Sequence, residues 1–203
     1  MAILGVAVAA DQAAGQLRLI PQVGLYVPMK DLGRVQNASG AADIAKKEGT
    51  LGLGLSLELG NSQGTSYRVN AVYGTASDVP VTTAGCTTCA ARSTVAAATA
   101  SVVMRPLPTI ILVRPYLQVG AGLKRYDFDE EDARAERLDA FVNDQNKLTG
   151  QLGIGFEVNL ALVRFFVEIS DFINKVDVGA EDAEQDGELQ HDFFITIGLP
   201  IGG

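Results

Sequence analysis

Leucine occupies every second position from residue 51 to residue 59, in the segment Leu51-Gly-Leu-Gly-Leu-Ser-Leu-Glu-Leu59. Glycine, serine and glutamate fill the positions between the leucines. Successive side chains along a β-strand point to opposite faces, so this segment has one large apolar face and one small or polar face. A helix would spread the leucines around its whole circumference, so the pattern predicts a strand.

Similar alternation recurs along the chain and gives eight predicted strands. Each is close to the roughly 9–11 residues that a tilted membrane-spanning strand needs. The predicted strands cover residues 17–27, 50–59, 66–73, 98–104, 114–126, 148–158, 164–170 and 192–199.

The predicted connections alternate between short and long. Short turns fall at 60–64, 106–112 and 159–162, and long loops fall at 28–49, 74–97, 127–147 and 171–191. Such alternation is typical of outer-membrane barrels, which have short turns on one side and long loops on the other. Two of the long loops contain patterns that predict short helices, Ala41–Lys47 and Glu130–Phe141.

The sequence also indicates which face of the predicted barrel points outward. An eight-stranded barrel has an interior only just wide enough for side chains, and the bulky apolar set would overfill it. The opposite face is rich in glycine, including Gly52, Gly54, Gly120 and Gly153, and glycine suits a crowded, tightly curved wall. The apolar face is therefore predicted to face lipid. The alternative is a soluble lipocalin-like barrel that binds a ligand inside.

Charge and hydropathy exclude some classes of protein. The net charge of −8 and the absence of a basic stripe argue against a nucleic-acid partner. No apolar run approaches the roughly 20 residues of a membrane-spanning helix. Acidic residues gather in blocks, at Asp127–Asp132 and Glu181–Glu188, which are predicted to be solvated loops.

The N-terminal segment differs from the rest of the chain. Residues 2–10 are apolar and are followed by small residues, which resembles the second half of a secretory signal peptide. We expect a signal peptide over residues 1–16, export through the periplasm, and a single barrel domain over residues 17–203.

Four segments together resemble a known family. They are the leucine ladder, Pro115–Gly122, Glu168–Asp171 and His191–Gly198, and they look like the walls of the OmpA/OmpX/OmpW-type small outer-membrane barrels. The resemblance covers Leu17 to the C-terminus. It implies an all-β, eight-stranded antiparallel up-and-down transmembrane barrel in the outer membrane, surrounded by lipid and monomeric. These patterns build walls, so they specify the fold and say little about function.

The chain has two cysteines, Cys86 and Cys89, in one of the predicted long loops. Two cysteines do not supply the four ligands of a structural zinc site, and no βαβ pattern indicates a thioredoxin-like centre. An exported protein meets an oxidising compartment. We predict a local disulfide, with a redox or metal role or free thiols as the alternatives.

His191 is the only histidine. Small barrel enzymes that modify lipid A use a histidine with serine or acidic partners. Here His191 is in phase with outward-facing Phe193, while the adjacent Asp192 points to the opposite face. We predict an interfacial histidine at the membrane rim and no enzyme activity, with no catalytic, cofactor-binding or metal-binding residues and no cofactor.

Charged residues on the inward face form the candidate site of the barrel. Isolated charges inside would be costly, so they should pair across the lumen. Arg68 is expected to contact at least one of Glu58, Glu157 and Glu168. A salt-bridged plug is predicted, and a narrow polar pore is the alternative. The predicted lumen charges are Glu58, Arg68, Arg114, Lys124, Glu157, Arg164, Glu168 and Asp192.

The predicted function is a non-enzymatic outer-membrane protein. It would stabilise the envelope or contact an extracellular partner through its four long loops, because function in such scaffolds tends to lie in loops. The alternative is an OmpW-like conduit or porin for small, largely apolar molecules.

Overall fold

A computed structural model gives the fold. It describes residues 16–29, 33–36, 42–45, 49–61, 64–83, 86–107, 112–129, 145–160, 163–176 and 188–202. Within these ranges, side chains are described except at 33–36, 42–45, 76–83, 86–92, 128–129, 145, 176 and 188.

Each of the eight predicted strands coincides with a long strand of the structure. These are β1 (Gln16–Pro28), β4 (Thr50–Gly60), β5 (Thr65–Thr83), β6 (Cys86–Met104), β7 (Val113–Asp129), β8 (Gln145–Leu160), β9 (Val163–Val176) and β10 (Glu188–Gly198). Two strands of four residues, β2 (Gly33–Gln36) and β3 (Ala42–Ala45), lie between β1 and β4 in the chain.

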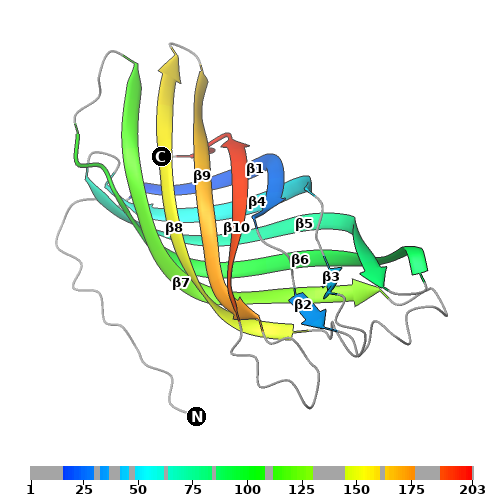
Figure 1. Cartoon of the computed structure of the whole chain (residues 1–203). Helices are drawn as coiled ribbons and strands as arrows, with labels where there is room; N and C mark the ends of the chain where they lie inside the picture. The colour runs from blue at the N-terminus through cyan, green and yellow to red at the C-terminus, as the bar shows by residue number, and fades with distance from the viewer. Residues whose placement is uncertain are drawn as a thin grey trace.

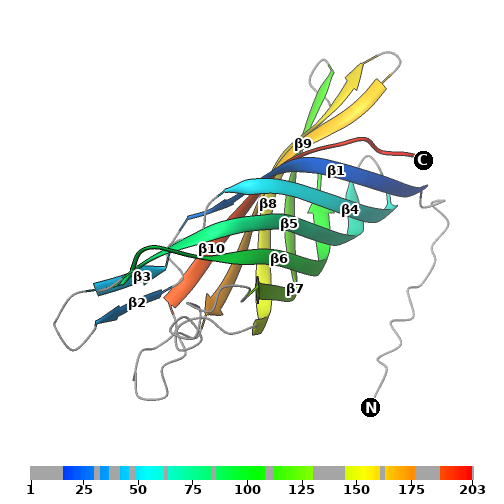
Figure 2. The same ribbon diagram turned by 90° about the vertical axis from the view of Figure 1, so that its right-hand side faces the viewer.

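The eight long strands form a closed antiparallel barrel. Each strand pairs with the next along the chain, and β1 closes the barrel by pairing with β10, where Leu25 lies opposite Ile195. In Figure 2, β1, β4, β5 and β6 lie side by side as one wall, with β8 and β10 behind them. The predicted up-and-down topology is confirmed. The described residues contain no helix long and apolar enough to cross a membrane.

The apolar face of the barrel lies on the outside. Leu53, Leu55 and Ile154 are about half exposed, whereas Glu58 on the opposite face of β4 is 1% exposed. A lipocalin-like soluble barrel would have the reverse arrangement, so that alternative is wrong.

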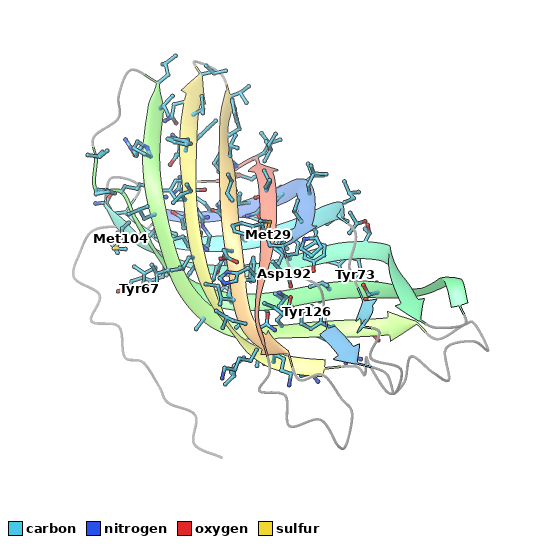
Figure 3. The ribbon with its side chains drawn as sticks, viewed as in Figure 1. Met29, Tyr67, Tyr73, Met104, Tyr126 and Asp192 are labelled. Carbon is cyan, nitrogen blue, oxygen red and sulfur yellow. The ribbon has the colours of Figure 1, made fainter. Side chains whose placement is uncertain are left out.

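Two tyrosines on β5 mark the two ends of this apolar belt. Tyr67 lies near the short-turn end and Tyr73 six residues further on, and both side chains point outward; Figure 3 shows them well apart. Six residues of strand span about 20 Å at roughly 3.3 Å per residue. Aromatic residues at both borders of the belt are characteristic of membrane barrels.

Two predictions for the long loops are wrong. Residues 74–97 were expected to form a loop, but β5 and β6 continue through most of them, with register shifts between Gly74 and Ser77 and between Val81 and Thr83. A hairpin that extends beyond the apolar belt has no lipid face to impose alternation, so periodicity does not reveal it.

The second wrong prediction is the helix at Ala41–Lys47. Residues 42–45 form β3, which pairs with β2 and, through Ile44 and Thr82, with β5. Figure 1 shows β2 and β3 beside the far ends of β5 and β6. An isolated helix this short is marginal, so strand pairing is favoured. The predicted helix at Glu130–Phe141 lies outside the described residues, as do residues 1–15 of the expected signal peptide.

Gly155 leaves room for a side chain that crosses the inner wall. Tyr116 on β7 and Glu168 on β9 are its register partners on either side. A Cβ atom at residue 155 would lie 2.3 Å from Cζ of Tyr116. The Tyr116 ring therefore lies over Gly155, and its hydroxyl reaches Glu168 at 2.7 Å.

Gly155→Ala is expected to lower the free energy of unfolding by about 1–3 kcal/mol, because Tyr116 must shift away from Glu168. Denaturant unfolding of the folded barrel in lipid measures the effect. Gly150→Ala, also on β8, is the matched control, since its added Cβ meets only the Ile173 carbonyl oxygen at 3.9 Å. Equal losses for the two variants would contradict this role of Gly155.

Candidate functional site: the barrel lumen

Where side chains are described, every second residue of the eight long strands points into the lumen, and the polar ones form three layers. An ion-pair cluster lies at the short-turn end, an amide and hydroxyl layer lies in the middle, and a Lys124–Asp192 cluster lies at the opposite end. The inward register of each strand follows from the same alternation that turns the leucines outward.

Glu58 is the centre of the ion-pair cluster. Its Oε1 accepts from Arg18, from Nη2 of Arg105 at 2.6 Å and from the Ser66 hydroxyl at 2.7 Å. Its Oε2 accepts from Arg68 twice, at 2.9 Å from Nε and 2.7 Å from Nη2. One carboxylate thus joins three guanidinium groups from β1, β5 and the end of β6. Glu58 is 1% exposed.

Arg68 connects this carboxylate to the other side of the barrel. Its Nη1 donates to Glu168 Oε2 at 2.6 Å and to Gln118 Oε1 at 3.0 Å. Its guanidinium carbon lies 5.2 Å from the ring centre of Tyr116 and 5.4 Å from that of Phe166. Ionic, neutral and aromatic partners therefore surround the guanidinium.

Glu157 completes the charge balance of the cluster. It lies 3.2 Å from Arg18 and 3.6 Å from Arg105. With Glu58 and Glu168, it sets three carboxylates against the three buried guanidiniums of Arg18, Arg68 and Arg105, each of the six residues no more than 6% exposed. Buried charges are tolerated when they are paired and hydrogen-bonded, as they are here.

Amide and hydroxyl groups fill the middle of the lumen. Asn70 Nδ2 donates to Gln151 at 3.1 Å and to Ser101 at 3.2 Å, and Asn70 Oδ1 accepts from the Ser56 hydroxyl at 2.7 Å. Thr99 donates to Gln151 at 2.6 Å. Strands on several sides of the barrel are thereby linked by neutral hydrogen bonds.

The third layer joins Lys124 to Asp192. Lys124 Nζ binds Asp192 Oδ2 and also lies 3.1 Å from Asn174 Oδ1. The hydroxyls of Tyr26 and Tyr126 donate to the two oxygens of Asp192, at 2.8 and 2.6 Å. Figure 3 shows Tyr126 and Asp192 near each other within the wrapped sheet.

The packing between these layers is tight. The gap between the amide and hydroxyl layer and the Lys124–Asp192 cluster has no volume that admits a water molecule. It is bordered by Gln22, Asn70, Gln151, Phe172 and Phe194. The described side chains therefore fill this cross-section of the lumen.

The structure brings together six of the eight predicted lumen charges in two groups. Glu58, Arg68, Glu157 and Glu168 belong to the first cluster, and Lys124 and Asp192 form the other.

The other two predicted lumen charges, Arg164 and Arg114, lie toward the rim of the barrel. Arg164 is 43% exposed in its side chain and lies 3.5 Å from Glu157 and 2.8 Å from Asn159. Arg114 is half-buried and lies opposite Glu157 in the β7–β8 register. Both follow the inward phase of their strands, but the strand ends place them near the mouth of the barrel.

Sequence reasoning missed two members of the ion-pair cluster, Arg18 and Arg105. Arg18 falls on the polar face of the first predicted strand, so the same alternation that selected Arg68 was available for it. Arg105 follows the last residue of β6 and is in phase with Ser101 and Val103. Continuing the alternation by one residue would have found it.

The remaining candidate residues lie outside the lumen. His191 lies on the outer wall and is about one-third exposed; its Nδ1 lies 2.8 Å from Oδ2 of Asp171, a partner that the sequence did not indicate. Cys86 and Cys89 belong to β6 rather than to a loop, and their disulfide stays a prediction. Among the described residues, no group of three or more side chains could hold a metal ion.

Comparison with solved structures identifies the architecture. No protein-family model and no curated protein matches the chain. The outer membrane protein OprG from Pseudomonas aeruginosa superposes with a TM-score of 0.55 at 16% identity, covering 94% of this chain and 97% of that one. Outer membrane protein AlkL gives 0.53 at 14% identity over 100% and 98%. Neisserial surface protein A gives 0.50 at 12% identity over 94% and 98%.

Each of these similarities covers at least 94% of the chain. The apolar exterior, the aromatic borders and the polar interior are independent features of a barrel built for lipid. The chain therefore has the fold of the small eight-stranded outer-membrane β-barrels.

Proposed function

We propose that this protein is a non-enzymatic wall protein of the outer membrane, which stabilises the envelope and presents its long loops to the exterior. The observation that carries the proposal is the filled lumen. Three guanidiniums and three carboxylates neutralise one another at the short-turn end. Such a network braces the barrel and leaves little freedom for a passing solute.

The ion pairs favour a plug over a pore for a second reason. A cation or anion crossing the lumen would have to displace Arg68 from Glu58 and Glu168. Removing one partner from a buried pair costs about 3–5 kcal/mol, so opening is rare at equilibrium. The closed state agrees with a structural role and argues against a general porin.

A conduit for small apolar molecules is the second candidate. One observation favours it: the half of the lumen away from the short turns contains a buried apolar cluster that includes Val72, Val95, Phe172 and Phe194. An apolar solute could enter there if the aromatic side chains moved. It would leave through the barrel wall, because the ion-pair cluster closes the short-turn end of the lumen.

A deletion strain separates the two candidates. With wild-type protein restored from a plasmid as the control, the wall proposal expects a general increase in sensitivity to detergent and large antibiotics. Uptake of small apolar solutes would change only as part of this general change in envelope permeability. Selective loss of uptake of one apolar solute, with envelope integrity unchanged, would contradict the proposal and favour the conduit.

A further inference from the structure

A pair of ionisable side chains lies on the lipid-facing wall. Asp171 on β9 and His191 on β10 point outward, and Nδ1 of the imidazole lies 2.8 Å from Oδ2 of the carboxylate. The Asp171 side chain is 16% exposed and that of His191 is 33% exposed. The proposed wall function does not involve this pair.

Asp171 lies within the apolar belt rather than beyond it. Its register partners are Leu152 on β8 and Phe193 on β10, and the preceding outward residue on β9 is Ile169. Ionisable groups on the lipid face are costly near the middle of the membrane. Where they occur inside a membrane they mark functional sites by default.

A shallow groove lies beside the carboxylate. It has a volume of about 330 Å³, and Asp171 is the ionisable residue among those that line it. Its walls are otherwise almost entirely apolar, and its outward side chains include Leu117, Val119, Leu152 and Ile154. The volume falls at the lower end of the roughly 300–1,000 Å³ of small-molecule sites.

The second oxygen of Asp171 is unsatisfied. Oδ1 is shielded, and no described side chain or backbone group donates to it. Hydrocarbon contains no water to supply a donor, so a donor must arrive on a molecule dissolved in the membrane. The Cβ–Cγ torsion of aspartate is soft, so a small rotation turns this oxygen toward the groove that its own side chain borders.

We propose that this groove binds an amphiphile of the lipid phase that carries a hydroxyl group, with its alkyl chain along the apolar walls and its hydroxyl donating to Asp171. The groove has an almost entirely apolar lining and one carboxylate, which suits an alkyl chain that carries a single hydroxyl group. His191 contacts Oδ2, which leaves Oδ1 as the acceptor for the ligand. This site is on the outer wall and is independent of whether the lumen conducts.

The single histidine makes a direct test practical. Protein labelled with ¹⁵N-histidine, folded in zwitterionic-lipid nanodiscs, is titrated with 1-dodecanol while the His191 imidazole signals are followed. The matched probe is the methyl ether of dodecanol, which has the same chain and cannot donate. We expect a saturable shift with the alcohol and none with the ether. Asp171→Leu should raise the dodecanol concentration that gives half of the maximal shift by about tenfold or more, because one charge-assisted hydrogen bond is lost.

Two further variants distinguish the groove from general partitioning into lipid. Leu152→Trp fills the groove and should abolish the response to dodecanol. Val69→Trp, on the outward face of β5 away from the groove, should leave the response unchanged. Each variant keeps an apolar side chain facing lipid, so folding is expected to be retained. Equal shifts with alcohol and ether, or an alcohol response that survives Asp171→Leu, would overturn the proposal.

Discussion

Replacing Glu58 with glutamine is expected to lower the free energy of unfolding by about 3–5 kcal/mol. Glutamine has nearly the same shape, but it removes the negative charge shared by Arg18, Arg68 and Arg105. Its amide nitrogen would also place donors against guanidinium donors. Arg18 and Arg105 keep Glu157 as a partner, and Arg68 keeps Glu168. The substitution therefore removes one anion that the three arginines share.

Urea unfolding of the purified barrel in lipid vesicles, read by the gel mobility of folded and unfolded forms, measures the Glu58→Gln effect. Asp127→Asn is the matched control, since Asp127 forms an exposed pair with Arg125 at 3.4 Å. Exposed pairs contribute about 0–1 kcal/mol. A similar small loss in both variants would show that the ion-pair cluster does not brace the barrel.

Leu55→Arg is expected to make folding into the bilayer less favourable by about 2–4 kcal/mol. Leu55 lies on the lipid face midway along β4 and is 49% exposed. A guanidinium there would sit in hydrocarbon with no partner and no water. The same substitution in a soluble barrel would place a charge at an exposed position at little cost.

Because the cost of a lipid-facing charge depends on its depth in the membrane, a second position on β4 serves as the control for Leu55→Arg. Leu59, 52% exposed, lies one residue before the end of β4 at the short-turn side. Leu59→Arg should cost only about 0–1 kcal/mol, as for charges near the interface. Folding titrations in vesicles compare the two variants. Equal costs at Leu55 and Leu59 would mean that the apolar face does not cross a membrane.

The wall of the barrel is predictable from sequence because one physical rule acts on every residue in it. Lipid on one side and a crowded lumen on the other impose strict alternation, so Leu53 and Glu58 were assigned to opposite faces correctly. The same rule selected Arg68 as a lumen residue. It also placed His191 on the outer wall.

Other features could not be read from alternation. The extensions of β5 and β6 lie beyond the belt, where no lipid face enforces a period, and β3 depends on pairing with a distant strand. The Asp171–His191 contact joins residues 20 positions apart through the β9–β10 register. Alternation assigns a residue to a face, but the register decides which neighbours it meets.

We propose that the lumen is closed by its own side chains. Recording from purified protein in planar lipid bilayers tests it most directly. A barrel plugged by the ion-pair cluster and the Lys124–Asp192 cluster should insert without stable conductance steps, while Glu58→Gln, which loosens the plug, should produce brief openings at most. A large, stable and ohmic conductance from the wild-type monomer would contradict this account.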